Sequence, residues 1–231
     1  MSAEAPQDNL EQIQSQVKEY IEKFHQKQII KEARKRWQDH TPAWARYHDP
    51  EHTDDVLEES LFFAIADGIT DERKLELIGI MAIFHDLSMT MEPDDLENLR
   101  KGHEKKGAGL AADAMQRFGY SEGDIKIVTE SIEDTEIKRV GEVLVQQTAR
   151  HDLGKYLLDG DVANFGRSDF SQKSKDEFAE LQLVLKDPPD RPTFNKNTLG
   201  FIKNHTFQSP AAIKYRQPQQ IINIAELEKV V

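Results

Sequence analysis

Apolar residues separated by three or four positions recur along most of the chain, and this spacing constrains the fold more than any other feature. A clear run near the start consists of Leu10, Ile13, Val17, Tyr20, Ile21 and Phe24. Such a run predicts a helix with one apolar face. Only 12 Gly and 9 Pro occur in 231 residues, too few for the frequent turns of an all-β protein. We therefore predict an all-α fold.

The same spacing predicts the other helices. They cover about residues 51–67, 71–85, 103–118, 121–134, 140–158, 170–186, 194–205 and 211–227. Thr70, Asp71 and Ser121 are N-cap candidates, and Ser121 with Asp124 resembles a capping box. Loops are predicted at 42–47 and 87–102, and no β-hairpin signal is found. Pro218 should kink or interrupt the last helix.

One domain accounts for the chain length, because a helical enzyme of this size need not divide. We predict a single helical domain over residues 9–231, a bundle of roughly eight to ten helices, after a flexible tail at residues 1–8. Apolar residues make up 38% of the chain, which suffices for a core when the helices are amphipathic.

The formal net charge of −12 disfavours some classes of partner. A chain this acidic, without a basic stripe, repels nucleic-acid polymers and anionic membrane surfaces. The first residues lack the pattern of a signal peptide, and no apolar run approaches the roughly 18 residues of a membrane span. We expect a cytoplasmic protein with neither kind of partner. A small phosphorylated substrate stays compatible, because a bound metal reverses the local charge.

The chain has no cysteine, so any metal site must use imidazole and carboxylate groups. Three histidines, His52, His85 and His103, continue the apolar faces of successive predicted helices. An imidazole in a core needs a partner, so each is either a hydrogen-bonded core residue or a metal ligand. Asp86 directly follows His85. A carboxylate in the same apolar region favours the metal, because a divalent cation compensates both groups.

Several segments around these residues resemble the HD superfamily of metal-dependent phosphohydrolases. They are YHDPEHTDDVL around His52, IMAIFHDLS around His85 and Asp86, HEKKGAGLAADAMQRF from His103, and LLDGDVANFG around Asp161. The likeness covers about residues 45–170. It is weaker in the C-terminal extension, 171–231, where NHTF and INIAEL are similar to family segments. The resemblance implies an HD-type helical fold.

Carried over by position, the resemblance makes His52, His85, Asp86 and Asp161 the metal ligands. A second His-Asp pair, His151 and Asp152, lies just upstream of Asp161, so Asp152 is the alternative last ligand. The segment DGDVANFG is more similar to the family's aspartate segment, which favours Asp161. We interpret the second pair as a polar patch on a helix.

Two further histidines are candidate catalytic residues. The start YHDPEH is similar to that of cyclic-nucleotide phosphodiesterases, where the earlier histidine protonates the leaving group; here that residue is His48. The alternative for His48 is a solvated loop residue. His103 lies where two-metal members of the superfamily have an extra histidine. It could instead contact the substrate phosphate or be structural, so the number of ions stays open.

The resemblance implies hydrolysis of a phosphate ester of a nucleotide or a related small molecule by a metal-activated water. The ion could be Mn, Fe, Ni, Co, Zn or Mg, since imidazole and carboxylate do not select among them. Two alternatives remain: a catalytically silent HD-fold module for ligand binding or signalling, and a di-iron oxygenase of the same fold. Cations that could steady the phosphate are Arg46, Lys101, Lys105, Lys106 and Arg150.

Overall fold

The computed structural model describes residues 6–91, 96–141 and 143–231. Its helices are α1 (Pro6–His25), α2 (Gln28–His40), α3 (Pro50–Ala66), α4 (Glu72–Phe84), α5 (Leu96–Arg100), α6 (His103–Arg117), α7 (Glu122–Glu133), α8 (Gly154–Asp161), α9 (Phe170–Val184), α10 (Arg191–Asn204) and α11 (Pro210–Leu227). Short 3-10 turns are η1 (Leu87–Thr90), η2 (Ala163–Gly166) and η3 (Glu228–Val230). The all-α fold class is confirmed.

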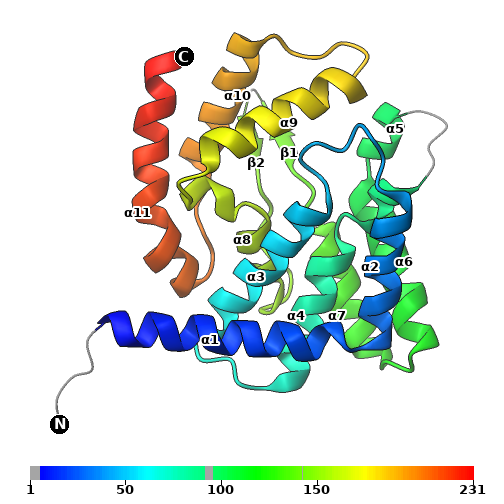
Figure 1. The fold of residues 1–231 in the computed structure, drawn as a ribbon. Helices are drawn as coiled ribbons and strands as arrows, with labels where there is room; N and C mark the ends of the chain where they lie inside the picture. Colours follow the sequence, from blue (N-terminus) through cyan, green and yellow to red (C-terminus); the bar gives the residue numbers. More distant parts are fainter. Residues whose placement is uncertain (1–5, 92–95, 142) are drawn as a thin grey trace.

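Helices α3 and α4 form the middle of the molecule. Helix α3 packs against both α4 and α8, and α1 runs across one end of it (Figure 1). Every residue from Leu75 to Thr90 is buried, so α4 and η1 contact other elements on all sides. A helix that is apolar all round is typical of a protein interior. The largest fully buried side chains, including Phe24, Phe63 and Ile78, belong to this core.

Side-chain caps fix where the helices that carry the site begin. Asp49 accepts a hydrogen bond from the backbone N–H of His52 at 2.9 Å, and Pro50 follows it in the first turn of α3. Asp71 caps α4 and Ser121 caps α7, as the sequence predicted. A cap satisfies backbone N–H groups that have no partner inside the helix.

Two glycines allow helices to approach closely at the middle of the molecule. A Cβ on Gly160 of α8 would lie 3.1 Å from the Val56 carbonyl oxygen of α3, and closer still to the Ser60 hydroxyl. A Cβ on Gly107 of α6 would lie 2.5 Å from the carbonyl oxygen of His85. Both distances are shorter than ordinary van der Waals contact, so a side chain at either position would require the neighbouring groups to shift.

The predicted helix over 140–158 is wrong. Strands β1 (Lys138–Val140) and β2 (Val143–Val145) form a two-stranded antiparallel sheet there, with Lys138 opposite Val145. An irregular segment follows, and α8 begins only at Gly154. Branched valines favour a strand over a helix, and Gly141 adopts the left-handed φ of +62° that a tight turn requires.

Three other boundaries differ from the predictions. Helix α11 continues through Pro218 without interruption, because a proline removes one backbone hydrogen bond while side chains on both sides of it anchor the helix. The predicted loop at 87–102 contains η1 and α5, and residues 92–95 lie outside the described part. Helix α1 begins at Pro6, so residues 6–8 of the predicted tail are helical; residues 1–5 are not described.

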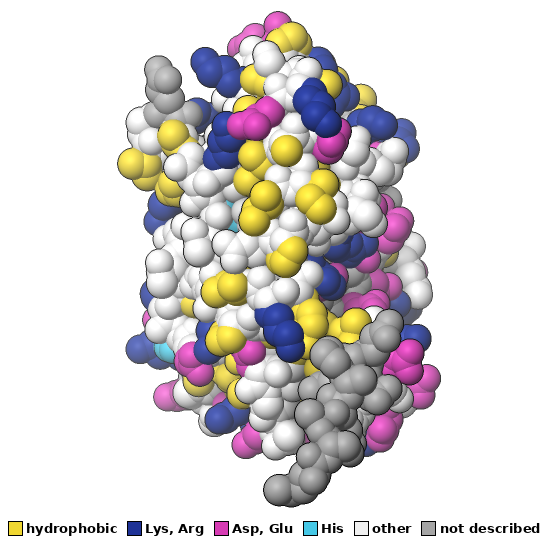
Figure 2. Space-filling view, turned by 90° about the vertical axis from the view of Figure 1, so that its left-hand side faces the viewer, with side chains coloured by type: hydrophobic (Ala, Val, Ile, Leu, Met, Phe, Trp, Pro, Cys, Tyr) yellow, Lys and Arg dark blue, Asp and Glu magenta, His cyan; other side chains and the backbone are white. Residues whose placement is uncertain are grey.

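The face formed by α11 carries several exposed apolar side chains, among them Ile221 and Ile222. In Figure 2, basic and acidic side chains are interspersed on this face, and the view contains no continuous basic stripe. Among the described helices, none has both the length and the apolar character required to cross a bilayer.

Candidate metal centre

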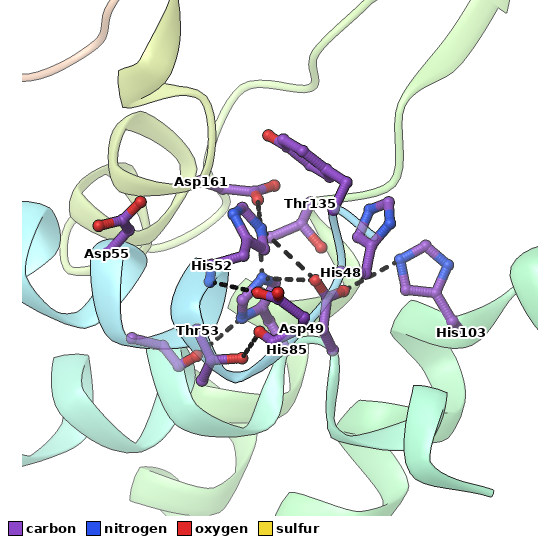
Figure 3. A network of polar contacts seen from close by, with 12 residues as sticks. His48, Asp49, His52, Thr53, Asp55, His85, His103, Thr135 and Asp161 are labelled. Carbon is purple, nitrogen blue, oxygen red and sulfur yellow. Dashed lines mark hydrogen bonds and ion pairs between the residues drawn. The ribbon is translucent and has the colours of Figure 1, made fainter. Parts of the chain in front are cut away.

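Side chains from three separate parts of the chain meet beside α3. Helix α3 supplies His52, His85 directly follows α4, and the last residue of α8 is Asp161 (Figure 3). Asp86 is adjacent to His85 in sequence. We refer to His52, His85, Asp86 and Asp161 as the metal centre. Their positions follow from the fold, because α4 and α8 both pack directly against α3.

The donor atoms of the metal centre are close together. His52 Nε2 lies 3.3 Å from Asp161 Oδ1 and 3.6 Å from Asp86 Oδ2. His85 Nε2 lies 3.0 Å from Asp86 Oδ2 and 3.6 Å from Asp161 Oδ1. The structure thus brings together the four residues that the resemblance named as ligands.

Three of these donor atoms have no hydrogen-bond partner in the described part of the chain. They are Nε2 of His52, Nε2 of His85 and Oδ2 of Asp86, and all three are buried. One buried polar atom without a partner costs about 1–3 kcal/mol. His85 Nε2 and Asp86 Oδ2 lie 3.0 Å from each other, so either a proton on His85 or a bound cation would stabilise this pair.

The hydrogen bonding of His85 fixes which ring nitrogen can bind a metal. Nδ1 lies 2.7 Å from the carbonyl oxygen of Ala82, and because a carbonyl only accepts, Nδ1 must carry a proton. In the neutral ring the lone pair is therefore on Nε2, which faces the Asp86 carboxylate. Two acceptors at that distance require a proton or a metal ion between them.

The electrostatics of the metal centre favour positive charge. Burial lowers the pKa of His85, but Asp86 and Asp161 outweigh it and raise this pKa to about 9. Burial raises the pKa of Asp86, yet His85, His48 and His103 hold it well below its usual range. Asp86 is therefore ionised inside the protein, and the surrounding groups compensate for its charge.

Three residues of the metal centre, His52, His85 and Asp161, have donor atoms of a spacing and chemistry that fit a divalent ion, and Asp86 is not part of this group of three. One donor atom from each of His52, His85 and Asp161 lies within 4.8 Å of the other two. Ligands about 2.0–2.2 Å from one ion lie roughly 3–4.4 Å apart, so this spacing matches a single ion. Imidazole nitrogen and carboxylate oxygen suit Zn, Mn, Fe, Co and Ni.

His52 and His48 are held by neighbouring side chains. The ring of Tyr47 packs against that of His52, with centroids 4.7 Å apart. His48 Nδ1 lies 2.5 Å from Glu180 Oε1. The side chain of His48 is only 12% exposed, so His48 is not a solvated loop residue. Its ring centroid lies 5.7 Å from that of His52.

Glu180 of α9 connects the C-terminal extension to the metal centre. Its Oε2 accepts hydrogen bonds from the backbone N–H groups of Arg46, Tyr47 and His48 at 3.0–3.1 Å. Its Oε1 accepts one from Arg100 at 2.6 Å. Burial raises the pKa of this carboxyl, but His48 and Arg100 lower it well below its usual range. Glu180 thereby fixes the position of the loop that carries His48.

The carboxylates of Glu180 and Asp86 determine the charge of His48. Burial lowers the pKa of His48, but the carboxylates of Glu180 and Asp86 outweigh it, so that the pKa is raised. Nδ1 of His48 contacts the Glu180 carboxylate, which leaves Nε2 as the nitrogen that would exchange a proton with a bound molecule.

His103 lies on the other side of Asp86. Its Nδ1 donates to the carbonyl oxygen of Arg100 at 2.7 Å, which leaves Nε2 facing Asp86 Oδ1 at 3.2 Å. One oxygen of Asp86 therefore faces His52 and His85, and the other faces His103. This arrangement is compatible with one ion and a hydrogen-bonded His103, or with Asp86 bridging two ions.

The second His-Asp pair lies apart from the metal centre. His151 contacts Glu130 at 2.5 Å, and Asp152, whose side chain is 80% exposed, pairs with Lys155 at 2.7 Å. The pair lies in the turn before α8 rather than on a helix, contrary to our interpretation. Asp161, not Asp152, is the aspartate close to His52.

Two of the cations expected to steady phosphate are paired with carboxylates. Lys101 pairs with Glu97, and Arg150 pairs with Asp134. Arg100, immediately before Lys101 in sequence, is the cation that contacts Glu180 near His48. Sequence reasoning missed Arg100 and Glu180, because neither lies in a segment with a local signal and their contact joins helices 80 residues apart.

The chain was compared with family models, curated proteins and solved structures, and none of these comparisons found a match.

Proposed function

We propose that this protein is a metal-dependent hydrolase of phosphate esters, acting on a nucleotide or a related small molecule. The observation that carries the proposal is the convergence of His52 Nε2, His85 Nε2 and Asp86 Oδ2, three buried donor atoms without partners among the described residues. The likeness of the segments around them to the HD superfamily supports the same conclusion.

The metal centre would hold the ion through His52, His85, Asp86 and Asp161. A divalent ion bound by imidazole and carboxylate lowers the pKa of a water molecule and neutralises charge on phosphate oxygens. Asp86 contributes a full negative charge, and Ala82 orients the ring of His85 through its carbonyl oxygen. Such an outer contact strengthens the ligand that it orients.

His48 is the residue best placed to move a proton. Its Nδ1 contacts Glu180, which stabilises the protonated ring, while Nε2 remains available to protonate a leaving alkoxide. Arg100, 3.4 Å from His48 Nδ1, compensates the charge of Glu180 and adds positive charge beside the substrate phosphate. His103 would hold Asp86 in place or contact the phosphate.

The experiment is to remove bound metal, reload the protein with Mn, Mg, Co, Ni, Zn or Fe, and measure phosphate release from a panel of nucleotides. We expect release that depends on the ion, and loss of release in Asp86→Ala, with Asp152→Ala as the matched control. Metal binding without release would instead favour the silent module. Two iron ions per chain with oxygen consumption would favour the oxygenase.

A further inference from the structure

A cavity of about 650 Å³ lies between the start of α6, the end of α7 and the segment that leads to α8. Glu104 and Lys105 line it on the α6 side. Asp134, Lys138 and Gln147 line the opposite side. A cavity of this volume is large enough for a small-molecule ligand.

Two residues that line the cavity adjoin residues of the candidate site. Glu104 follows His103 in sequence, and its Oε1 lies 3.5 Å from His103 Nδ1. Asp134 precedes Thr135, which is drawn with the residues of the metal centre in Figure 3. A phosphate bound at the metal centre could therefore extend the rest of its molecule into this cavity.

The residues that line the cavity offer no aromatic ring on which a nucleobase could stack. Within the described part of the chain, all of them are charged, polar or glycine, and none is aromatic or aliphatic. A base is normally held by stacking on a flat ring or by apolar contact. A sugar or polyol presents hydroxyl groups that both donate and accept hydrogen bonds, and charged side chains can satisfy both roles.

Two lining residues are left with unused hydrogen-bonding capacity. Glu104 is only 8% exposed, and no side chain of another described residue donates a hydrogen bond to it; His103 is its single ion-pair partner there. Lys105 forms no ion pair within the described ranges. In contrast, Lys138 already binds Gln147 at 2.8 Å. A buried carboxylate needs donors, which a polyol would provide.

We propose that this cavity binds the sugar or polyol part of a phosphate ester, with Glu104 accepting hydrogen bonds from its hydroxyl groups and Lys105 donating to it. The proposal rests on the proposed phosphohydrolase activity. The proposed function includes nucleotides and related small molecules. Among these, the cavity favours phosphate esters that carry hydroxyl groups and lack a base.

Three substrates test the proposal with the Mn-loaded protein: para-nitrophenyl phosphate, ribose 5-phosphate and adenosine 5′-monophosphate. Adenosine 5′-monophosphate carries a base that ribose 5-phosphate lacks. We expect the kcat/KM for ribose 5-phosphate to be about tenfold higher than that for adenosine 5′-monophosphate. Hydrolysis of para-nitrophenyl phosphate with adenosine monophosphate preferred over ribose 5-phosphate would overturn this inference alone. Hydrolysis of none of the three would overturn the proposed function, and the inference with it.

Variants locate the effect in the cavity. In Glu104→Gln, the kcat/KM for ribose 5-phosphate divided by that for para-nitrophenyl phosphate should fall about tenfold, mainly through KM. The exposed Lys105→Gln should lower the same ratio about threefold and is not expected to disturb folding. Glu122→Gln, at the far end of α7, is the matched control. An unchanged ratio in both cavity variants, with metal content retained, would contradict the proposal.

Discussion

The same dipeptide, His-Asp, occurs twice in this chain with opposite surroundings. His85 and Asp86 are buried, with 1% and 2% exposure, and each has a donor atom without a hydrogen-bond partner in the described structure. His151 and Asp152 each have a nearby ion-pair partner, and the Asp152 side chain is 80% exposed. A candidate metal site therefore requires burial and the convergence of several donor atoms, and the His-Asp dipeptide alone does not create one.

The difference arises from the elements that carry the two pairs. His85 and Asp86 directly follow α4, which is surrounded by other helices, so their side chains face groups from α3, α6, α8 and the loop that carries His48. His151 and Asp152 lie in a turn at the surface, where water and nearby charges satisfy them. Surface ion pairs of this kind contribute about 0–1 kcal/mol, so the second pair is free to vary.

Removal of His85 should cause the largest change, a loss of metal binding. His85→Ala eliminates one ligand and leaves Asp86 buried without its nearest compensating group, so metal affinity should fall by more than about 100-fold. The measurement is metal content by elemental analysis of the purified variant, with folding checked by circular dichroism. A folded variant with unchanged metal content would show that His85 does not bind the ion.

Substitution of Glu180 should reduce activity by about 100-fold without loss of metal. In Glu180→Gln the carboxylate that stabilises protonated His48 is removed, so the pKa of His48 falls. Activity that needs the protonated ring is lost as pH rises through this pKa, so the alkaline limb of the pH–rate profile should move to lower pH. A parallel drop in rate at every pH would contradict the positioning role and indicate a structural one.

His205 differs from both His85 and His151, because it is buried without a carboxylate beside it. It is buried among Phe165, Phe201 and Phe207, and burial lowers its pKa to about 4. The unfolded chain, where the pKa is about 6.5, binds more protons between these values. The stabilising contribution is therefore fully present above pH 6.5 and is lost as pH falls to 4, by at most about 3 kcal/mol.

The measurement for His205 is the free energy of unfolding by urea between pH 4 and 7, compared with His205→Phe. The wild-type chain should lose more stability on acidification than the variant, because phenylalanine does not titrate. Equal pH dependence of the two proteins would mean that His205 has the same pKa in the folded and the unfolded chain, which would contradict the prediction.

Removal of the second His-Asp pair should have the smallest effect. His151→Ala breaks the contact with Glu130 at the surface, so the unfolding free energy should change by less than about 1 kcal/mol. Metal content and phosphate release should match the wild-type protein. A loss of metal in this variant would remove the distinction between the two pairs.

Periodicity predicted most of the helices, because apolar faces repeat within each segment. His52 and His85 are predicted as metal-ligand candidates because they continue such faces. Only the resemblance of its segment to the HD superfamily favours Asp161 over Asp152. The hairpin at residues 138–145 and the contacts of Glu180 could not be derived. Glu180 contacts His48 across 132 residues, and an isolated helix gives no indication of its distant neighbours.

The close approach of α8 to α3 at Gly160 limits how the candidate site could adjust to an ion. Asp161 is the next residue, so the backbone that carries its carboxylate is held close to α3, the helix of His52. Gly107 fixes the approach of α6 to the end of α4 in the same way. With both backbones held in place, only rotation of the side chains themselves could adapt the donor positions to an ion of a different radius.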